Sequence, residues 1–198
     1  MSYHVAAYLV SGQRLEALTK GKSQLAEVWK DVEAGEHTKR FAQSLDEGFA
    51  DDFKDGCPDT YRALLTLMQG KAQEATEWEY MYGYALQLLC ETYGQALTND
   101  GFTELTSVEY LLDLEVFSAK VLNFRVYDDF FAMPPALPLP LSEYPMVGFL
   151  PLSRAKPLAK GFVELNLEHP EFGEGLSTLQ SWVDHMLTEK KDLITFFY

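Results

Sequence analysis

The strongest candidate for chemistry in this sequence is an acidic stretch with interleaved aromatic residues. Between Asp46 and Asp59 the chain carries six carboxylates against the single base Lys54. Carboxylates can steer and orient a basic protein surface, and aromatic side chains can supply its buried anchor. The residues predicted to contact a partner are Asp46, Glu47, Phe49, Asp51, Asp52, Phe53 and Asp55. The alternative interpretation is a solvated helix end whose two phenylalanines face the core.

A second candidate precedes the most proline-dense part of the chain, MPPALPLPLSEYP. Tyr127, Asp128 and Asp129 lead into this segment and could line a cleft beneath a loop spanning residues 132–148. Two polar groups converging in such a cleft would suit a small hydrolase or a ligand-binding domain. The alternative is a solvated turn.

Other catalytic patterns are missing from the sequence. The four histidines, His4, His37, His169 and His185, do not pair with Cys or with one another at zinc-ligand spacing, and H-E-x-x-H is absent. No G-x-S-x-G, P-loop or G-x-G-x-x-G motif occurs. We therefore assign no catalytic residue, no metal ligand and no cofactor.

The two cysteines do not suggest redox chemistry. Cys90 lies in an apolar helical pattern and is expected to be a small buried hydrophobic residue. Cys57 lies between Asp55 and Asp59, whose charges would raise its pKa and disfavour a reactive thiolate. A bridge between Cys57 and Cys90 stays open, with nothing in the sequence to favour it.

The overall charge restricts the class of partner. The 198 residues carry a formal charge of −14, which repels nucleic acid and anionic membranes and favours a basic protein. The alternative is that the acidity serves solubility alone. No apolar run reaches the roughly 18 residues that a membrane span needs. The N-terminus also lacks the basic region of a signal peptide, so we predict a cytoplasmic protein.

The elements that would position these residues are organised around one long helix, predicted for Gln73–Leu97. Its apolar residues recur at three- and four-residue steps and then cover nearly the whole circumference, which is typical of a helix buried on several sides. Further helices are predicted for residues 11–19, 23–34, 36–53, 58–70, 107–119, 153–160 and 174–190.

Strands are predicted at the two ends of the chain. Tyr3–Val10 and Leu193–Tyr198 are apolar on both alternating faces, as in strands covered on both sides, and we expect them to pair. Residues 121–126 could form a strand or continue a helix, and residues 132–148 are predicted to be an ordered wrapping loop. The fold class is α+β: one domain over residues 1–198, with a small sheet that contains both terminal strands and packs against several helices.

Three segments carry a resemblance to a known kind of protein: SYHVAAYLV, then YGYALQLLCETYGQAL with NDGF, and the helix of Trp182 running into ITFFY. Together they resemble a group of bacterial domains of unknown function, which implies an α+β fold and a cytoplasmic bacterial protein. By size and charge the chain is also similar to immunity proteins, which neutralise toxins.

The leading hypothesis is therefore a non-enzymatic binding protein, of immunity or antitoxin type, that blocks a basic toxin through its acidic and aromatic surface. The alternative is the hydrolase or ligand-binding site beneath residues 132–148. A homodimer that buries the proline-rich loop is a third hypothesis.

Overall fold

The computed structural model describes residues 4–21, 24–74, 77–102, 107–122, 125–132, 135–140, 142 and 144–198. It has the predicted α+β class and forms two compact units. The sheet unit comprises Met1–Ser11, Gln95–Pro135 and Met146–Tyr198, and the helical unit comprises Gly12–Gly94 and Ala136–Pro145. The organisation as one domain stays a prediction.

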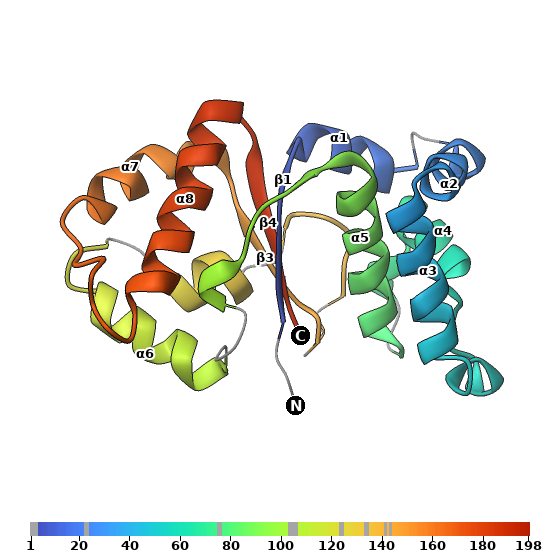
Figure 1. The fold of residues 1–198 in the computed structure, drawn as a ribbon. Coiled ribbons are helices and arrows are strands. Elements are labelled where there is room, and N and C mark those ends of the chain that lie inside the picture. The colour runs from blue at the N-terminus through green and yellow to red at the C-terminus, as the bar shows by residue number, and fades with distance from the viewer. Residues whose placement is uncertain are drawn as a thin grey trace. The chain divides into compact units, whose positions relative to one another are not determined.

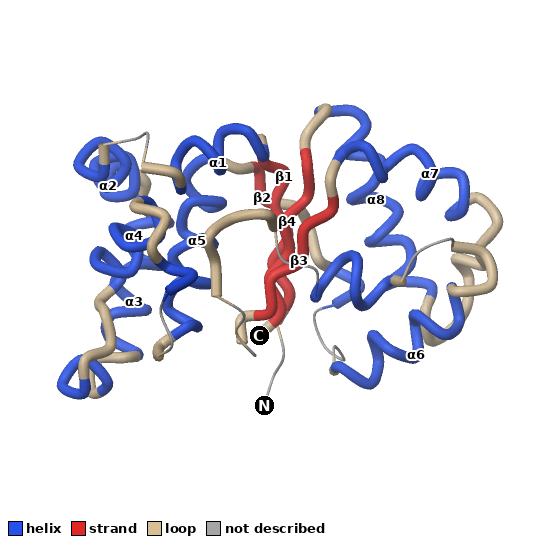
Figure 2. Tube along the Cα trace, turned by 180° about the vertical axis from the view of Figure 1, so that it is seen from behind, coloured by secondary structure: helices blue, strands red, loops and turns tan. Residues whose placement is uncertain are grey.

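In the described part of the sheet unit, four antiparallel strands form a sheet in the order β2-β1-β4-β3 (Figure 2). Their bounds are β1 Val5–Val10, β2 Gln95–Ala96, β3 Met146–Leu150 and β4 Asp192–Phe197. β1 and β4 pair along their whole length, from Val5 opposite Phe197 to Val10 opposite Asp192. The predicted pairing of the two terminal strands is therefore confirmed.

The sheet unit also contains helices, of which α8 packs on the sheet (Figure 1). They are α6 Val108–Ser118, α7 Leu152–Phe162 and α8 Gly173–Glu189, with a 3-10 turn at Asp100–Phe102 and a π-helical turn, η4, at Asp128–Ala132. α8 contacts β1, β4 and α7, and it presents Trp182 to a core that also holds Phe102, Phe130 and Phe131. Burial of these large aromatic side chains stabilises this unit.

The described residues of the helical unit form five α-helices, which Figure 1 labels. They are α1 Gly12–Thr19, α2 Leu25–Ala34, α3 Glu36–Gly48, α4 Thr60–Met68 and α5 Glu79–Tyr93, with 3-10 turns η1 at Asp52–Asp55 and η2 at Ala72–Glu74. α5 is buried from Met81 through Gly83 and again from Ala85 through Cys90. The prediction of a helix buried on several sides is confirmed.

The bounds predicted for this helix and for its neighbour were wrong. α5 begins at Glu79, because Trp78 has a left-handed backbone (φ 61°), and it ends at Tyr93, because Gln95–Ala96 pair with β1. Residues 75 and 76 of the predicted span lie outside the described residues. The helix predicted for 36–53 ends at Gly48, and η1 follows it.

The segment around the prolines also differs from its prediction. Residues 146–148 belong to β3, so the predicted loop ends earlier than expected. Leu139 is buried, as expected for a loop lying on a core, whereas residues 133, 134, 141 and 143 lie outside the described residues. Val121 is in a turn and Val126 is helical, so the described residues of 121–126 do not form the strand considered for them, and residues 123 and 124 lie outside the described residues.

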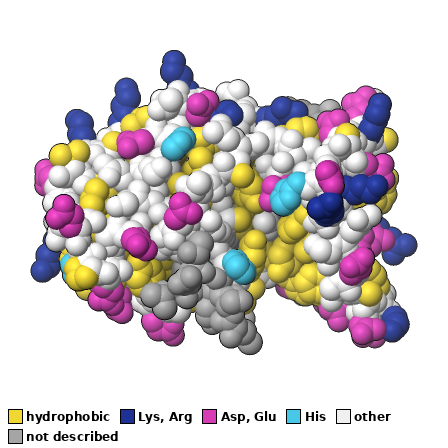
Figure 3. Space-filling model, in the orientation of Figure 1, with side chains coloured by type: hydrophobic (Ala, Val, Ile, Leu, Met, Phe, Trp, Pro, Cys, Tyr) yellow, Lys and Arg dark blue, Asp and Glu magenta, His cyan; other side chains and the backbone are white. Residues whose placement is uncertain are grey.

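The surface carries mixed charge. On the face drawn in Figure 3, carboxylates are spread over the surface, with Lys and Arg interspersed at both ends of the view. Among the described residues, no helix is both long and apolar enough to cross a membrane.

Candidate functional site

Two carboxylates of the acidic stretch hold the start of α4. Asp59 is the N-cap residue, and its Oδ1 accepts a hydrogen bond from the Arg62 N–H at 2.8 Å. Asp46, near the end of α3, accepts the Thr60 N–H at 2.8 Å. Both therefore satisfy N–H groups that the first turn of a helix leaves without partners. These two acids have a structural role that accounts for their position.

A third carboxylate, that of Asp52 at the start of η1, belongs to a small polar cluster with Tyr80 and Cys57. The Tyr80 hydroxyl donates to Asp52 Oδ2 at 3.0 Å, and Cys57 Sγ lies 3.7 Å from the same hydroxyl oxygen. Burial and these two neighbours raise the pKa of Tyr80, so that its hydroxyl remains a donor at physiological pH. Phe49 packs against Tyr80 and Tyr84, with ring centroids 5.0 and 5.7 Å away. Phe49 is thus part of the packing of the helical unit.

The remaining predicted contact residues lie at the surface. Glu47, Asp51 and Asp55 are exposed. Phe53, which lies between Asp51 and Asp55 in the sequence, is half-buried. The one nearby base, Lys54, makes an exposed ion pair with Asp51 at 2.7 Å. Such a pair is worth little in water, so it does not remove the local negative character. Three of the seven predicted residues are therefore exposed carboxylates, here called together the η1 surface: Glu47, Asp51 and Asp55.

Neither thiol has the environment of a reactive cysteine. Burial raises the pKa of both Cys57 and Cys90, and the charges of Asp52 and Asp59 add to the shift of Cys57, as the sequence predicts for Asp59. Both residues are buried and both thiols are free.

We therefore expect iodoacetamide to leave the native protein unmodified at neutral pH and to add two groups per chain in urea. The reason is that alkylation needs an accessible thiolate, which only unfolding supplies. Mass spectrometry before and after denaturation measures the number of adducts. Modification of Cys57 in the native state at the rate of a free thiol would contradict this prediction.

The second predicted site, in the sheet unit, is organised by ion pairs that the sequence does not reveal. Asp129 is only 7% exposed, and its Oδ2 accepts from the Arg125 N–H at 3.0 Å and from an Arg154 terminal nitrogen at 3.2 Å. Asp128 forms an ion pair with Arg125 at 2.5 Å. Both carboxylates are thus engaged by arginine, and Asp129 is held in a fixed position.

Glu115 of α6 completes this network. Its carboxylate is 8% exposed and accepts from Arg125 Nε at 2.9 Å and from the Tyr127 N–H at 2.9 Å. The Tyr127 hydroxyl contacts Met146 Sδ at 3.3 Å. Tyr127, Asp128 and Asp129 lie together, but their polar groups already have partners in the protein. Those partners are Glu115, Arg125 and Arg154, and the contacts connect η4 to α6 and α7.

Sequence inspection missed Glu115, Arg125 and Arg154. The only signal that could have indicated Arg154 is the composition of residues 152–162, which hold three bases and no acid in an acidic chain. Among the residues that the structure describes, no three His, Cys, Asp or Glu side chains are grouped so as to hold a metal ion.

Comparison with protein-family models matches residues 1–198 to the domain of unknown function DUF7691. The chain belongs to this family. No curated protein and no solved structure matches it. Membership of DUF7691 agrees with the resemblance to domains of unknown function, and it adds no activity to the geometry described above.

Proposed function

We propose that this DUF7691 chain is a binding protein that recognises a basic protein through the η1 surface. The observation that carries the proposal is that some carboxylates of the acidic stretch bind groups of the fold while others are exposed. Asp46, Asp52 and Asp59 bind groups of their own unit, whereas Glu47, Asp51 and Asp55 are exposed beside a single lysine. Exposed carboxylates that no fold contact requires are free to orient a cationic partner.

The class of partner that suits this surface best is a basic bacterial toxin, for which the chain would act as a cytoplasmic immunity or antitoxin protein. A net charge of −14 would accelerate encounter with such a partner. The half-buried Phe53 lies between Asp51 and Asp55 in the chain and would add apolar contact.

The alternative, a hydrolase or ligand site that uses Tyr127, Asp128 and Asp129, has less support. A general base needs a carboxylate that can take up a proton from a substrate. The carboxylate of Asp129 already accepts from a backbone N–H and from Arg154, and that of Asp128 pairs with Arg125. The hypothesis of a homodimer is addressed by light scattering of the purified chain.

The test is affinity capture from a lysate of the native host at low salt, followed by a salt titration. We expect the triple variant E47Q/D51N/D55N to retain the partner about tenfold less well, because three exposed charge pairs each contribute roughly 0.2–1 kcal/mol. Retention by the unmodified chain should also fall with salt, since exposed charges are screened.

The matched control is E168Q/D184N/E189Q, which removes three exposed carboxylates from the sheet unit. This control should retain the partner as the unmodified chain does. Equal losses in both triple variants would show that net charge, rather than the η1 surface, governs capture. If nothing is retained even at low salt, the proposal fails.

A further inference from the structure

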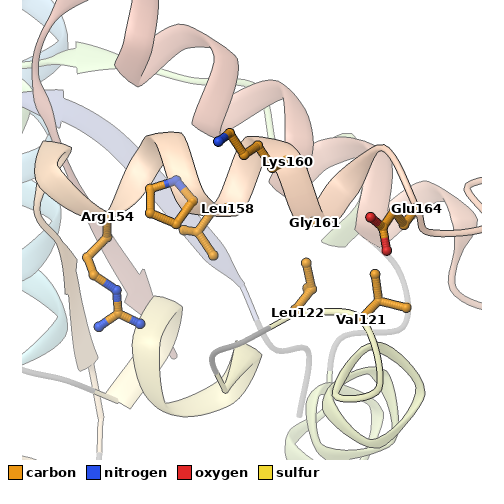
Figure 4. Close-up of a pocket in the computed structure, with 8 residues that line it drawn as sticks. Val121, Leu122, Arg154, Leu158, Lys160, Gly161 and Glu164 are labelled. Carbon is orange, nitrogen blue, oxygen red and sulfur yellow. The ribbon is translucent and has the colours of Figure 1, made fainter.

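A cleft in the sheet unit lies beside α7 and the turn at residues 121–122. Its volume is about 440 Å³, within the range of small-molecule sites. Leu122, Pro157 and Leu158 supply apolar lining, and the charged lining residues are Arg154, Lys160 and Glu164. Figure 4 shows Arg154 and Glu164 at opposite ends of the lining, with Leu122 and Leu158 between them. The cleft therefore combines an apolar middle with a charged group at each end.

At one end of the cleft, the guanidinium of Arg154 is hydrogen-bonded to a buried carboxylate of the sheet unit. Arg154 donates from one terminal nitrogen to Asp129 at 3.2 Å, and Asp129 is fixed in turn by the Arg125 N–H. A guanidinium has five N–H donors in a planar fork, so this bond leaves donors to spare. Because Asp129 orients Arg154, a ligand would lose less side-chain entropy in binding it. Asp129 is thus a positioning residue for the cleft.

The charge of α7 also favours an anion. The helix carries Arg154, Lys156 and Lys160 and no acid, although the whole chain has 30 acidic and 16 basic residues. Arg154 is in the first turn of α7, where the aligned peptide dipoles place their positive end. A cation there is unfavourable for the helix alone, and it adds to the positive potential of the first turn.

We propose that this cleft binds a small organic carboxylate with a short apolar body. The carboxylate pairs with Arg154, Lys160 adds positive charge, and the apolar body covers Leu122 and Leu158. Glu164 repels an anion from the other end, so the ligand has one orientation. This small-molecule site lies in the sheet unit and does not depend on the proposed function of the η1 surface.

The experiment is an NMR titration of the ¹⁵N-labelled full chain with hexanoate. Hexan-1-ol and hexylamine serve as comparison ligands, because they have the same six-carbon chain with a neutral or a positive head group. We expect hexanoate at millimolar concentration to shift the backbone signals of residues 152–164 in a saturable way. Hexanol and hexylamine should shift them less. Equal effects of hexanoate and hexylamine, or no saturable shift with hexanoate, would overturn the proposal.

Matched variants of α7 test which of its side chains binds the carboxylate of hexanoate. Arg154→Gln should weaken hexanoate binding about tenfold, the effect of one charge-assisted contact of about 1.4 kcal/mol. Lys160→Gln should weaken it by about threefold, as for an exposed charge. Lys156→Gln removes an exposed cation of the same helix that does not line the cleft, and it should leave binding unchanged.

Circular dichroism checks that each variant is folded. If Arg154→Gln unfolds the unit, the comparison of Lys160→Gln with Lys156→Gln decides the outcome. A loss with Lys156→Gln equal to that with the lining variants would show binding to net charge only, and the proposed site would be wrong.

Discussion

Gly148→Ala is expected to destabilise the sheet unit by about 2–6 kcal/mol, a large fraction of the stability of a typical domain. Gly148 lies in β3 opposite Thr195 of β4. A Cβ at this position would overlap the backbone carbonyl of Phe130 and the hydroxyl of Thr195. The Phe130 carbonyl also accepts a hydrogen bond from that buried hydroxyl. Overpacking costs about 1–3 kcal/mol, and disturbing the buried hydrogen bond adds about 1–3 kcal/mol.

The comparison that isolates the overlap is Gly48→Ala. Gly48 is the last residue of α3, and a Cβ added there meets no atom within 4 Å. Alanine has a higher helix propensity than glycine, so this variant should gain up to about 1 kcal/mol. Urea denaturation followed by circular dichroism measures both variants. Equal stability of Gly148→Ala and the unmodified chain would disprove the contact between β3 and η4 on which the prediction rests.

The same glycine explains why β3 could not be predicted. The segment MVGFL is apolar and short, and Gly148 interrupts it, which disfavours the interior of a strand. The close approach of η4 is what requires glycine at this position. The terminal strands were predictable because their apolar residues occupy both alternating faces over six residues or more. A strand can therefore be predicted where the alternation of its side chains determines it. It cannot be predicted where a backbone contact with a distant segment requires glycine.

The acidic stretch shows a related limit for the candidate site. Its composition indicates carboxylates at a surface, and Glu47, Asp51 and Asp55 are exposed. The bond from Asp46 to the Thr60 N–H joins residues 14 positions apart, so it depends on how α3 and α4 meet. The network of Glu115, Arg125 and Arg154 depends in the same way on three separate elements. Such pairs follow from tertiary geometry and leave no local pattern.

The two candidate binding regions also differ in how the fold supports them. In the η1 surface, the structural carboxylates lie beside the exposed ones, so a variant must spare Asp46 and Asp59 to test binding without unfolding α4. In the cleft, Arg154 is itself positioned by a buried acid. Recognition is therefore separated from stability most cleanly by amide substitutions of the exposed residues: Glu47, Asp51, Asp55 and Lys160.

Trp182→Ala is expected to reduce the free energy of unfolding by about 3–5 kcal/mol, as for other large aromatic side chains in a core. Trp182 is 1% exposed, its ring lies 5.5 Å from Phe102 and 6.3 Å from Phe130, and its Nε1–H donates to the Thr98 carbonyl at 2.6 Å. Trp182→Phe keeps most of the volume and loses the donor, so it should cost about 1–2 kcal/mol.

The matched control, Trp29→Ala, also tests the predicted single domain. Trp29 belongs to the helical unit, is half-buried and contacts Tyr61 edge-on at 5.0 Å, so its loss should cost less than half as much. If residues 1–198 unfold as one cooperative domain, both variants shift the same transition in urea, measured by circular dichroism. Two transitions, each moved by only one variant, would contradict the single domain. A loss for Trp182→Ala no larger than for Trp29→Ala would instead contradict the aromatic core assigned to the sheet unit.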